Sequence, residues 1–248
     1  MSSTPTREYL NATTLKSEIA SFSSPAENPE LSAVPKVGDH FPESEQLAVL
    51  NNTNGKPAVV AFLRHCGCPF AEKTFRTFRD LSDTHPDTLF IAISHSSPED
   101  TEEWIISIGG TGDVVIITDP SRTLYAKWGL GFSSYWANVG PMTMWKALKL
   151  GSEEMIYNRP TKSGYRWQTA GAFAVDEVGV VRWGYVSRNA PDIPDFGDGL
   201  RAIGRGKTEK EREREREREE RRARRGGEEG KKSEEGRKSE EGDSVFTV

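Results

Sequence analysis

The stretch of residues 57–70, which reads PAVVAFLRHCGCPF, decides the fold. Its first half, 57–63, is a continuous apolar run, and such a run is typical of a central strand that is buried on both faces of a sheet. A polar turn at 64–68 follows, and Pro69 then suits the first position of a helix, where the N–H that proline lacks would have no partner. The stretch therefore predicts a buried strand, a short turn that carries two cysteines, and a helix.

The rest of the chain alternates between strand and helix patterns until a hairpin near its end. We expect strands at 47–50, 57–63, 89–94, 114–117, 171–176 and 180–186, and helices that begin near 69, 97, 119 and 192. An amphipathic patch at 9–19 is either a helix lying on the domain or a frayed end, and 132–159 is an aromatic-rich, partly helical insertion. Alternation followed by an antiparallel pair predicts an α/β fold with a mixed central sheet and helices on both faces.

Composition divides the chain into three parts. Residues 1–35 are rich in Ser, Thr and Pro and predict a partly flexible N-terminal extension, whereas 36–204 have the composition of a globular domain. In the low-complexity tail at 205–248 most residues are charged, so we expect it to be helical or disordered. The net charge of −5 is modest and mixed in sign, so no nucleic-acid partner is expected.

Hydropathy and cysteine usage narrow the class of protein. No segment approaches the ~18 consecutive apolar residues of a membrane span, and the N-terminus lacks the apolar core of a signal peptide. We therefore expect a cytoplasmic protein without a membrane partner. The chain has two cysteines and four histidines, too few for a disulfide framework or a zinc site, so no metal or other cofactor is expected. His40, His85 and His95 are expected at the surface or at strand ends.

The two cysteines differ in the position we expect for them. Cys68 would lie at the N-cap of the helix, where free N–H groups and the helix dipole stabilise a thiolate, so we predict it to be the catalytic nucleophile. Arg64 and His65 add positive or proton-accepting groups beside it. Cys66 is a candidate resolving thiol through a strained disulfide with Cys68, which Gly67 would permit. The alternative is that both thiols stay reduced and only pack.

The segment 60–71, VAFLRHCGCPFA, resembles the active-site segment of the AhpC/TSA-type thioredoxin-like proteins, and most closely that of the peroxiredoxin-like 2 branch. The late segments 168–176 and 183–189 resemble the last strands of that family. The resemblance extends over about 36–203 and implies a thioredoxin-like fold, to which the charged C-terminal tail is added.

The resemblance also implies roles for individual residues. It places Cys68 on the first cysteine of a Cys-x-x-Cys motif and Ala71 where the second would be. Ala61 and His65 stand where typical peroxiredoxins carry a proline and a peroxide-binding threonine. Arg188 corresponds to an arginine that approaches the thiolate in the family, and a surface role is its alternative.

On this resemblance the chain is expected to be a thiol-dependent oxidoreductase or antioxidant protein that reduces a peroxide or disulfide through the Cys68 thiolate. Its other partner would be an external thiol reductant, glutathione or a thioredoxin-like protein, unless Cys66 resolves the oxidised thiol. Two alternatives stay open. One is a non-catalytic thioredoxin-fold binding or regulatory protein, and the other, by analogy, is reduction of an endoperoxide-type lipid.

Overall fold

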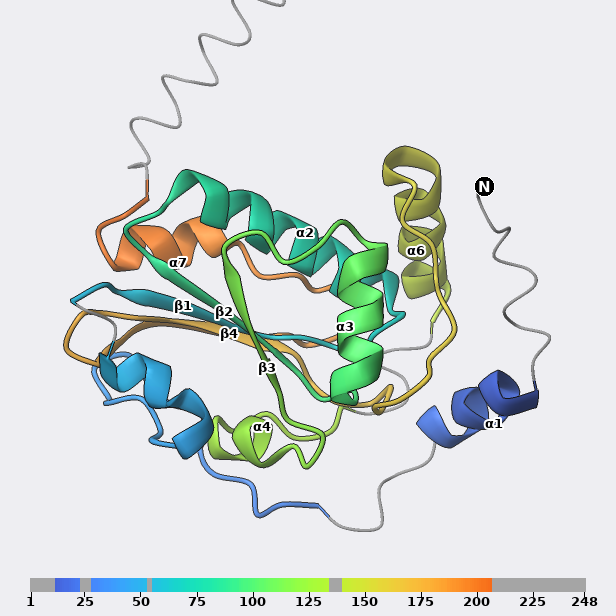
Figure 1. Ribbon diagram of the computed structural model, residues 1–248, viewed down its shortest axis with the longest axis horizontal. Helices are drawn as coiled ribbons and strands as arrows, with labels where there is room; N and C mark the ends of the chain where they lie inside the picture. The colour runs from blue at the N-terminus through green and yellow to red at the C-terminus, as the bar shows by residue number, and fades with distance from the viewer. Residues whose placement is uncertain (1–11, 23–27, 53–54, 134–139, 207–248) are drawn as a thin grey trace, which may run out of the picture. The chain divides into compact units, whose positions relative to one another are not determined.

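The computed structural model describes residues 12–22, 28–52, 55–133 and 140–206 (Figure 1). The chain up to Gly206 forms one unit by its contacts. Arg205 belongs to this unit, because its Nε lies 3.1 Å from Asp87 and its Nη2 lies 3.3 Å from Glu177. The expected helical or disordered tail lies, from residue 207 onward, outside the described residues and stays a prediction.

A five-stranded mixed sheet forms the centre of the fold, in the order β3-β2-β1-β4-β5. The strands are β1 (Ala58–Phe62), β2 (Leu89–Ser94), β3 (Val114–Thr118), β4 (Gly171–Val175) and β5 (Val181–Val186). β1 pairs with β2 in parallel and with β4 in antiparallel orientation, so the apolar run occupies the middle of the sheet. The predicted mixed sheet and its closing hairpin are confirmed.

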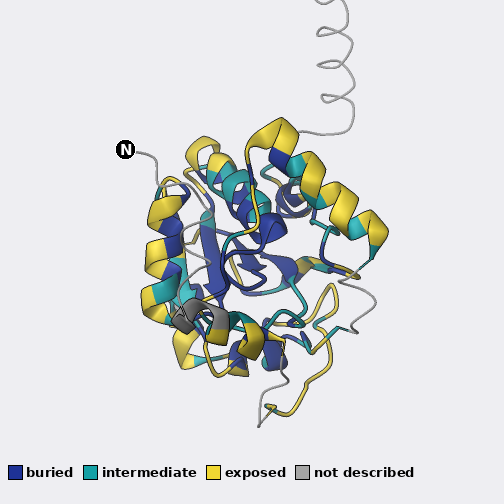
Figure 2. Ribbon diagram, turned by 90° about the vertical axis from the view of Figure 1, so that its right-hand side faces the viewer, coloured by how far each residue is buried: buried dark blue, intermediate teal, exposed yellow. Residues whose placement is uncertain are grey.

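Side chains of β1 alternate between two cores, one on each face of the sheet. Val59 and Ala61 join the core under α2 (Pro69–Thr84), α3 (Pro98–Ser107) and α7 (Phe196–Ala202). Val60 and Phe62 join the core under α4 (Thr123–Lys127). Figure 1 shows α2 and α7 on one face and α4 on the other, and Figure 2 shows buried strands in the middle of the domain, where β1 and β4 are buried along their whole length. The sheet end at residue 62 is thereby held from both sides.

The strand expected at 47–50 is wrong. This segment lies in the 3₁₀ helix η2 (Glu45–Asn52), where Leu47 and Leu50 are both buried in the core that contains Phe62. Two apolar residues three positions apart reach the same side of a 3₁₀ turn, whereas in a strand they would point to opposite faces.

The helix starts expected near 69 and 97 are confirmed, whereas those expected near 119 and 192 are wrong: α4 begins at Thr123 and α7 at Phe196, after the N-cap residues Arg122 and Asp195. Ser97 caps α3, because its Oγ accepts the N–H of Asp100 at 3.2 Å. The predicted insertion contains α6 (Pro141–Glu154), although residues 134–139 lie outside the described residues. The amphipathic patch at 9–19 forms α1 (Ala12–Ser21), of which residues from 12 onward are described. Among the described helices, none is both long and apolar enough to cross a membrane.

Candidate active site

The turn between β1 and α2 places Cys68 at the start of a helix. Cys68 is the N-cap of α2, with φ −70° and ψ 126°, and Pro69 occupies the first helical turn as expected. The turn is closed by two backbone hydrogen bonds, from Cys68 N–H to the His65 carbonyl at 3.2 Å and from Glu72 N–H to the Cys68 carbonyl at 3.1 Å. The N–H groups of a first helical turn lack partners within the helix, so an anion is favoured at this position.

Cys68 lines a cavity of about 710 Å³, which we call the Cys68 cavity. Its polar lining includes three of the predicted site residues, Cys68, Arg64 and His65. It also includes Arg166, which was not predicted from the sequence. The apolar lining comes from α2, α6, the residue after α1 and the segment before β4, and includes Phe22, Phe70, Pro141, Met144, Ala147 and Trp167. Such a concave, mostly apolar site with a few convergent polar groups is typical of a small-molecule site.

His65 is a neutral group in this cavity. Its side chain is 2 % exposed, and neither ring nitrogen has a hydrogen-bond partner among the described residues. Burial lowers the pKa of His65 well below its usual value, and the nearby cations Arg64 and Arg166 lower it further. Of the two roles expected for His65, a positive charge or a proton acceptor, the lowered pKa removes the first at neutral pH and makes the neutral imidazole a weak proton acceptor.

Two arginines link the cavity to the N-terminal helix. The Nη2 of Arg64 donates to the carbonyl of Arg166 at 2.5 Å. The Arg166 guanidinium forms an ion pair with Glu18, donates from Nε to Ser21 Oγ at 2.8 Å, and lies 4.5 Å from the centre of the Phe22 ring. Arg166 therefore holds α1 and its apolar end against the cavity.

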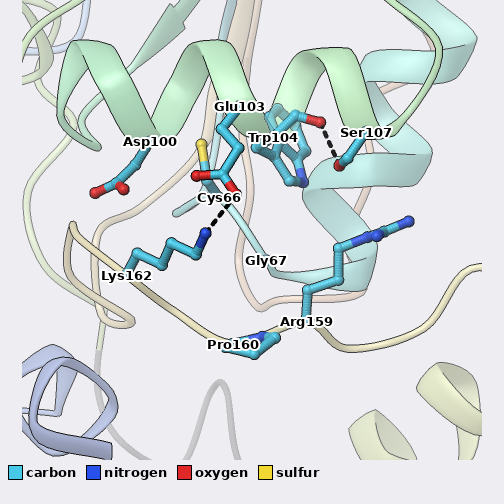
Figure 3. A pocket seen from close by; sticks show the side chains of 9 residues that line it. All are labelled: Cys66, Gly67, Asp100, Glu103, Trp104, Ser107, Arg159, Pro160 and Lys162. Carbon is cyan, nitrogen blue, oxygen red and sulfur yellow. Dashed lines mark hydrogen bonds and ion pairs between the residues drawn. The ribbon is translucent and has the colours of Figure 1, made fainter. Parts of the chain in front are cut away.

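Cys66 faces a different and much smaller cavity, of about 70 Å³ (Figure 3). Its Sγ lies 3.6 Å from Ser94 Oγ and 3.8 Å from Thr101 Oγ1, and its N–H donates to Ser96 Oγ at 3.1 Å. Burial raises the pKa of the Cys66 thiol above its ordinary value. These contacts describe a protonated thiol that is packed between β2 and α3.

Gly67 separates the two cysteines, and the chain after α6 packs directly against it. The Arg159 N–H donates to the Gly67 carbonyl at 2.9 Å, and a Cβ on Gly67 would lie 2.8 Å from the Arg159 carbonyl oxygen. Gly67 has φ +100°, which side chains rarely adopt. Both cysteines are free, and they line separate cavities. The structure thus does not bring the expected resolving thiol into the Cys68 cavity.

Glu72 fixes this packing from the first turns of α2. Its side chain is buried, forms an ion pair with Arg76, and accepts from Arg159 Nε at 3.2 Å. A buried carboxylate is costly unless it is paired, and the two arginines supply that pairing. Glu72 thereby ties the segment after α6 to the helix that carries Cys68.

Arg188 lies away from both cavities. Its side chain is 84 % exposed, and its Nε lies 3.1 Å from the carboxylate of Asp192, which also accepts from the Arg188 N–H at 2.9 Å. The approach to the thiolate that the resemblance implied is therefore absent from the structure, and Arg188 takes the surface position that was its alternative. Arg64 and Arg166 are the arginines that line the Cys68 cavity.

His95 follows β2 directly and is buried, so of the two positions expected for it only the strand end is correct. Its Nε2 lies 3.1 Å from the Tyr165 carbonyl and its Nδ1 lies 3.4 Å from the Tyr125 hydroxyl. Burial lowers the pKa of His95 to about 4. Within the described ranges, no group of three or more His, Cys, Asp or Glu side chains is placed to hold a metal ion.

A family model described as AhpC/TSA antioxidant enzyme matches residues 77–189, from the middle of α2 to the residues after β5. The mixed five-stranded sheet with its covering helices is the fold expected for this family. Residues 77–189 therefore resemble the AhpC/TSA family, and the fold is thioredoxin-like. The matched segment begins after Cys66 and Cys68, so it does not include either thiol. The chain's place in the peroxiredoxin-like 2 branch stays a prediction.

Solved structures to which this chain is similar include a thiol peroxidase from Chromobacterium violaceum, with 18% identity, 71% of this chain and 90% of that chain covered, and a TM-score of 0.48. Another is the peroxidoxin BcpB from Mycobacterium tuberculosis, with 16% identity, coverage of 70% and 99%, and a TM-score of 0.49. No curated protein sequence matches the chain.

Sequence reasoning missed the residues that build the far wall of the Cys68 cavity. Arg166 and Trp167 precede β4 by a few residues, and the indole Nε1 of Trp167 donates to the Phe22 carbonyl at 2.9 Å. Phe22 belongs to the extension that was expected to be partly flexible. A cation between two aromatic residues just before a buried strand, as in Tyr165-Arg166-Trp167, is the local signal that could have drawn attention to this segment.

Proposed function

We propose that this protein is a thiol-dependent oxidoreductase that reduces a peroxide or a disulfide through Cys68. The observation that carries the proposal is the position of Cys68 at the N-cap of α2, in a cavity that it shares with Arg64 and a neutral His65. A helix N-terminus favours a thiolate, and the thiolate is the nucleophile in reactions of this kind. A description of the matching family as antioxidant enzymes agrees with this chemistry.

In the peroxide reaction, the Cys68 thiol loses its proton, and the thiolate attacks one peroxide oxygen. An S–O bond forms while the O–O bond breaks, and the leaving oxygen takes up one proton in place of the one that the thiol lost. The products are a Cys68 sulfenic acid and one molecule of alcohol or water. The neutral His65 adds no positive charge to the cavity, so the α2 N-terminus and the two arginines are the groups that favour the thiolate.

We propose further that external thiols reduce the sulfenic acid. One thiol, from glutathione or a thioredoxin-like protein, displaces water and forms a mixed disulfide with Cys68, and a second thiol releases Cys68 as a new disulfide forms. The separate cavities favour this route over an internal disulfide, because the Cys66 thiol lies among the hydroxyls of Ser94 and Thr101.

The decisive experiment measures peroxide consumption with a thiol reductant for the wild type and for the matched pair Cys68→Ser and Cys66→Ser. We expect Cys68→Ser to lose the activity and Cys66→Ser to keep most of it. After one equivalent of peroxide, the intact mass should rise by one oxygen, and added glutathione should convert this form to a mixed disulfide. A loss of two hydrogens instead would establish the internal disulfide and overturn the external route.

A non-catalytic binding protein is the second candidate, and the apolar walls of the Cys68 cavity favour it. If neither cysteine changes with peroxide or with a disulfide, the redox proposal fails. A ligand that then binds equally well to wild type and Cys68→Ser would support the binding function.

A further inference from the structure

Helix α6 turns its large apolar side chains toward solvent. Met142, Trp145 and Leu148 are 62 %, 57 % and 67 % exposed. On its inner side Ala147 and Leu150 pack against the core and Gly151 is buried, so Leu150 is the one large apolar residue that α6 packs inward. A helix on the surface of a domain normally has the opposite arrangement, so packing within the domain does not explain this one. Contiguous exposed apolar residues mark a site of interaction.

The exposed apolar residues extend along α6 and past its end. We call the set Met142, Met144, Trp145, Leu148, Met155 and Tyr157 the α6 face, and each of its members is at least 49 % exposed. The helix lies at the periphery of the domain, beyond the end of α2 (Figure 1). By contrast, α3 exposes one large apolar side chain, Ile106, at 69 %.

Two lysines lie among the exposed apolar residues of this helix. Residues 141–151 contain Lys146 and Lys149, both exposed, and no acidic residue, although the chain as a whole has a net charge of −5. The two acidic residues lie in the last turn, where Glu154 is bound by Lys73 at 2.5 Å and Glu153 forms an exposed ion pair with Lys149 at 3.6 Å, a contact that is weak in water. The Nζ of Lys149 lies 5.7 Å from the Trp145 ring. Trp, Leu and Met beside lysines are typical of a helix that lies in the headgroup region of a membrane.

We propose that the α6 face binds the surface of an anionic lipid bilayer. With 14 residues α6 is roughly 21 Å long at ~1.5 Å per residue, so it is too short to cross a bilayer and would lie along its surface. Trp145 and Leu148 would enter the interface, while Lys146 and Lys149 would meet the lipid phosphates and carboxylates. This revises the expectation of no membrane partner, which rested on the lack of a spanning segment.

The bound lipid would lie next to the Cys68 cavity. Met144 belongs to the α6 face and also lines that cavity, so the two surfaces meet at this residue. The proposal does not depend on redox chemistry, because none of its contacts involves Cys68. A Cys68→Ser variant should therefore bind vesicles as the wild type does, which separates this test from that of the proposed function.

The test is flotation of the full chain with phosphatidylcholine vesicles that contain or lack phosphatidylserine. We expect the wild type to float with the anionic vesicles and the double variant Trp145→Ser/Leu148→Ser to bind them roughly tenfold more weakly, because two apolar anchors are lost. Ile106→Ser on α3 is the matched control, an equally exposed apolar residue outside the face, and it should bind as the wild type does.

A second variant tests the charges. Lys146→Glu/Lys149→Glu should lose binding to the anionic vesicles, and added salt should weaken binding of the wild type. Equal binding to vesicles with and without phosphatidylserine would overturn the anionic preference. Failure of the wild type to float, or self-association that Trp145→Ser/Leu148→Ser abolishes, would overturn membrane docking, the latter in favour of a second copy of the chain as the partner.

Discussion

Cys66 and Cys68 are two residues apart and almost equally buried, at 6 % and 5 % exposure, yet their surroundings differ in every other respect. Cys66 is enclosed by hydroxyl groups in a cavity of about 70 Å³, and burial raises the pKa of its thiol. Cys68 begins a helix and lines a cavity of about 710 Å³ with two arginines and a neutral histidine.

The comparison teaches that burial alone does not decide whether a cysteine is reactive. What differs is the surroundings of each thiol: Cys66 packs between the end of β2 and α3, whereas Cys68 lines the large cavity with Phe22 and residues of α6. Gly67 makes the division possible, because its positive φ turns the chain between them.

The largest expected effect is on alkylation. With iodoacetamide at neutral pH, Cys68 should react on the order of 100-fold faster than Cys66, because the raised pKa and close packing of Cys66 keep its thiolate scarce and shielded. Peptide mass spectrometry over a time course measures both rates in one sample. In denaturant the two rates should converge, and faster labelling of Cys66 in the native protein would reverse the comparison.

The next effect concerns the residue between the thiols. Gly67→Ala should lower the free energy of unfolding by about 2–4 kcal/mol, because the new Cβ meets the Arg159 carbonyl and the backbone has φ +100°. Gly38→Ala is the matched control: Gly38 also has φ +100°, but its Cβ would meet nothing within 4 Å, so we expect a loss of about 1 kcal/mol. Urea unfolding measures both, and equal losses would show that the contact with Arg159 contributes nothing.

The third expected effect is a loss of stability at acidic pH, caused by the two buried histidines His65 and His95. His95 has a folded-state pKa of about 4, below the ~6.5 of an unfolded histidine, so between these values the unfolded chain binds more protons. Stability is therefore lost as the pH falls, and His95 should account for roughly 3 kcal/mol between pH 7 and pH 4. His65, whose pKa is also lowered, adds to the same slope.

Unfolding free energies across that pH range, for wild type and His95→Gln, would test the effect. The variant should show a shallower decline with acid, whatever its stability at pH 7. His40→Gln, which replaces an exposed histidine in the same way, is the matched control. An identical slope in the wild type and His95→Gln would mean that His95 is protonated in the folded protein.

The smallest effect distinguishes the two arginine positions. Arg188→Ala should change the rate of Cys68 alkylation by less than about twofold, because Arg188 is exposed and bound to Asp192. Arg166→Ala should change that rate more, since the ion pair that holds α1 and Phe22 at the cavity is lost. Equal rates of Cys68 alkylation in the two variants would show that Arg166 has no influence on the reactivity of Cys68.

Local chemistry allowed much of the fold to be predicted. The apolar run at 57–63, the proline at 69 and the capping Ser97 each act on their neighbours in the chain, and each lies where it was expected. Leu47 and Leu50 misled because two apolar residues in a short segment fit a strand or a turn equally, and only the tertiary core shows that both face one side.

The candidate site was predictable only on the side formed by consecutive residues. Arg64, His65 and Cys68 lie within five positions of the sequence, so the turn itself brings them to one place. Arg166 and Phe22 reach the same cavity through contacts between segments more than a hundred residues apart, which no local pattern records. For Arg188, the resemblance implied a position near the Cys68 thiolate, but Asp192, four residues later in the sequence, binds the side chain at the surface.

The Cys68 cavity is built from two kinds of segment, those that also form the core of the sheet and those that lie outside it. Cys68 lies between the central strand β1 and α2, which also carry the core, whereas most of the wall comes from α6, Phe22 and the segment before β4. Insertions and substitutions in those outer segments can alter what enters the cavity while leaving the sheet untouched. The size and polarity of the cavity can therefore change without any change in the position of Cys68.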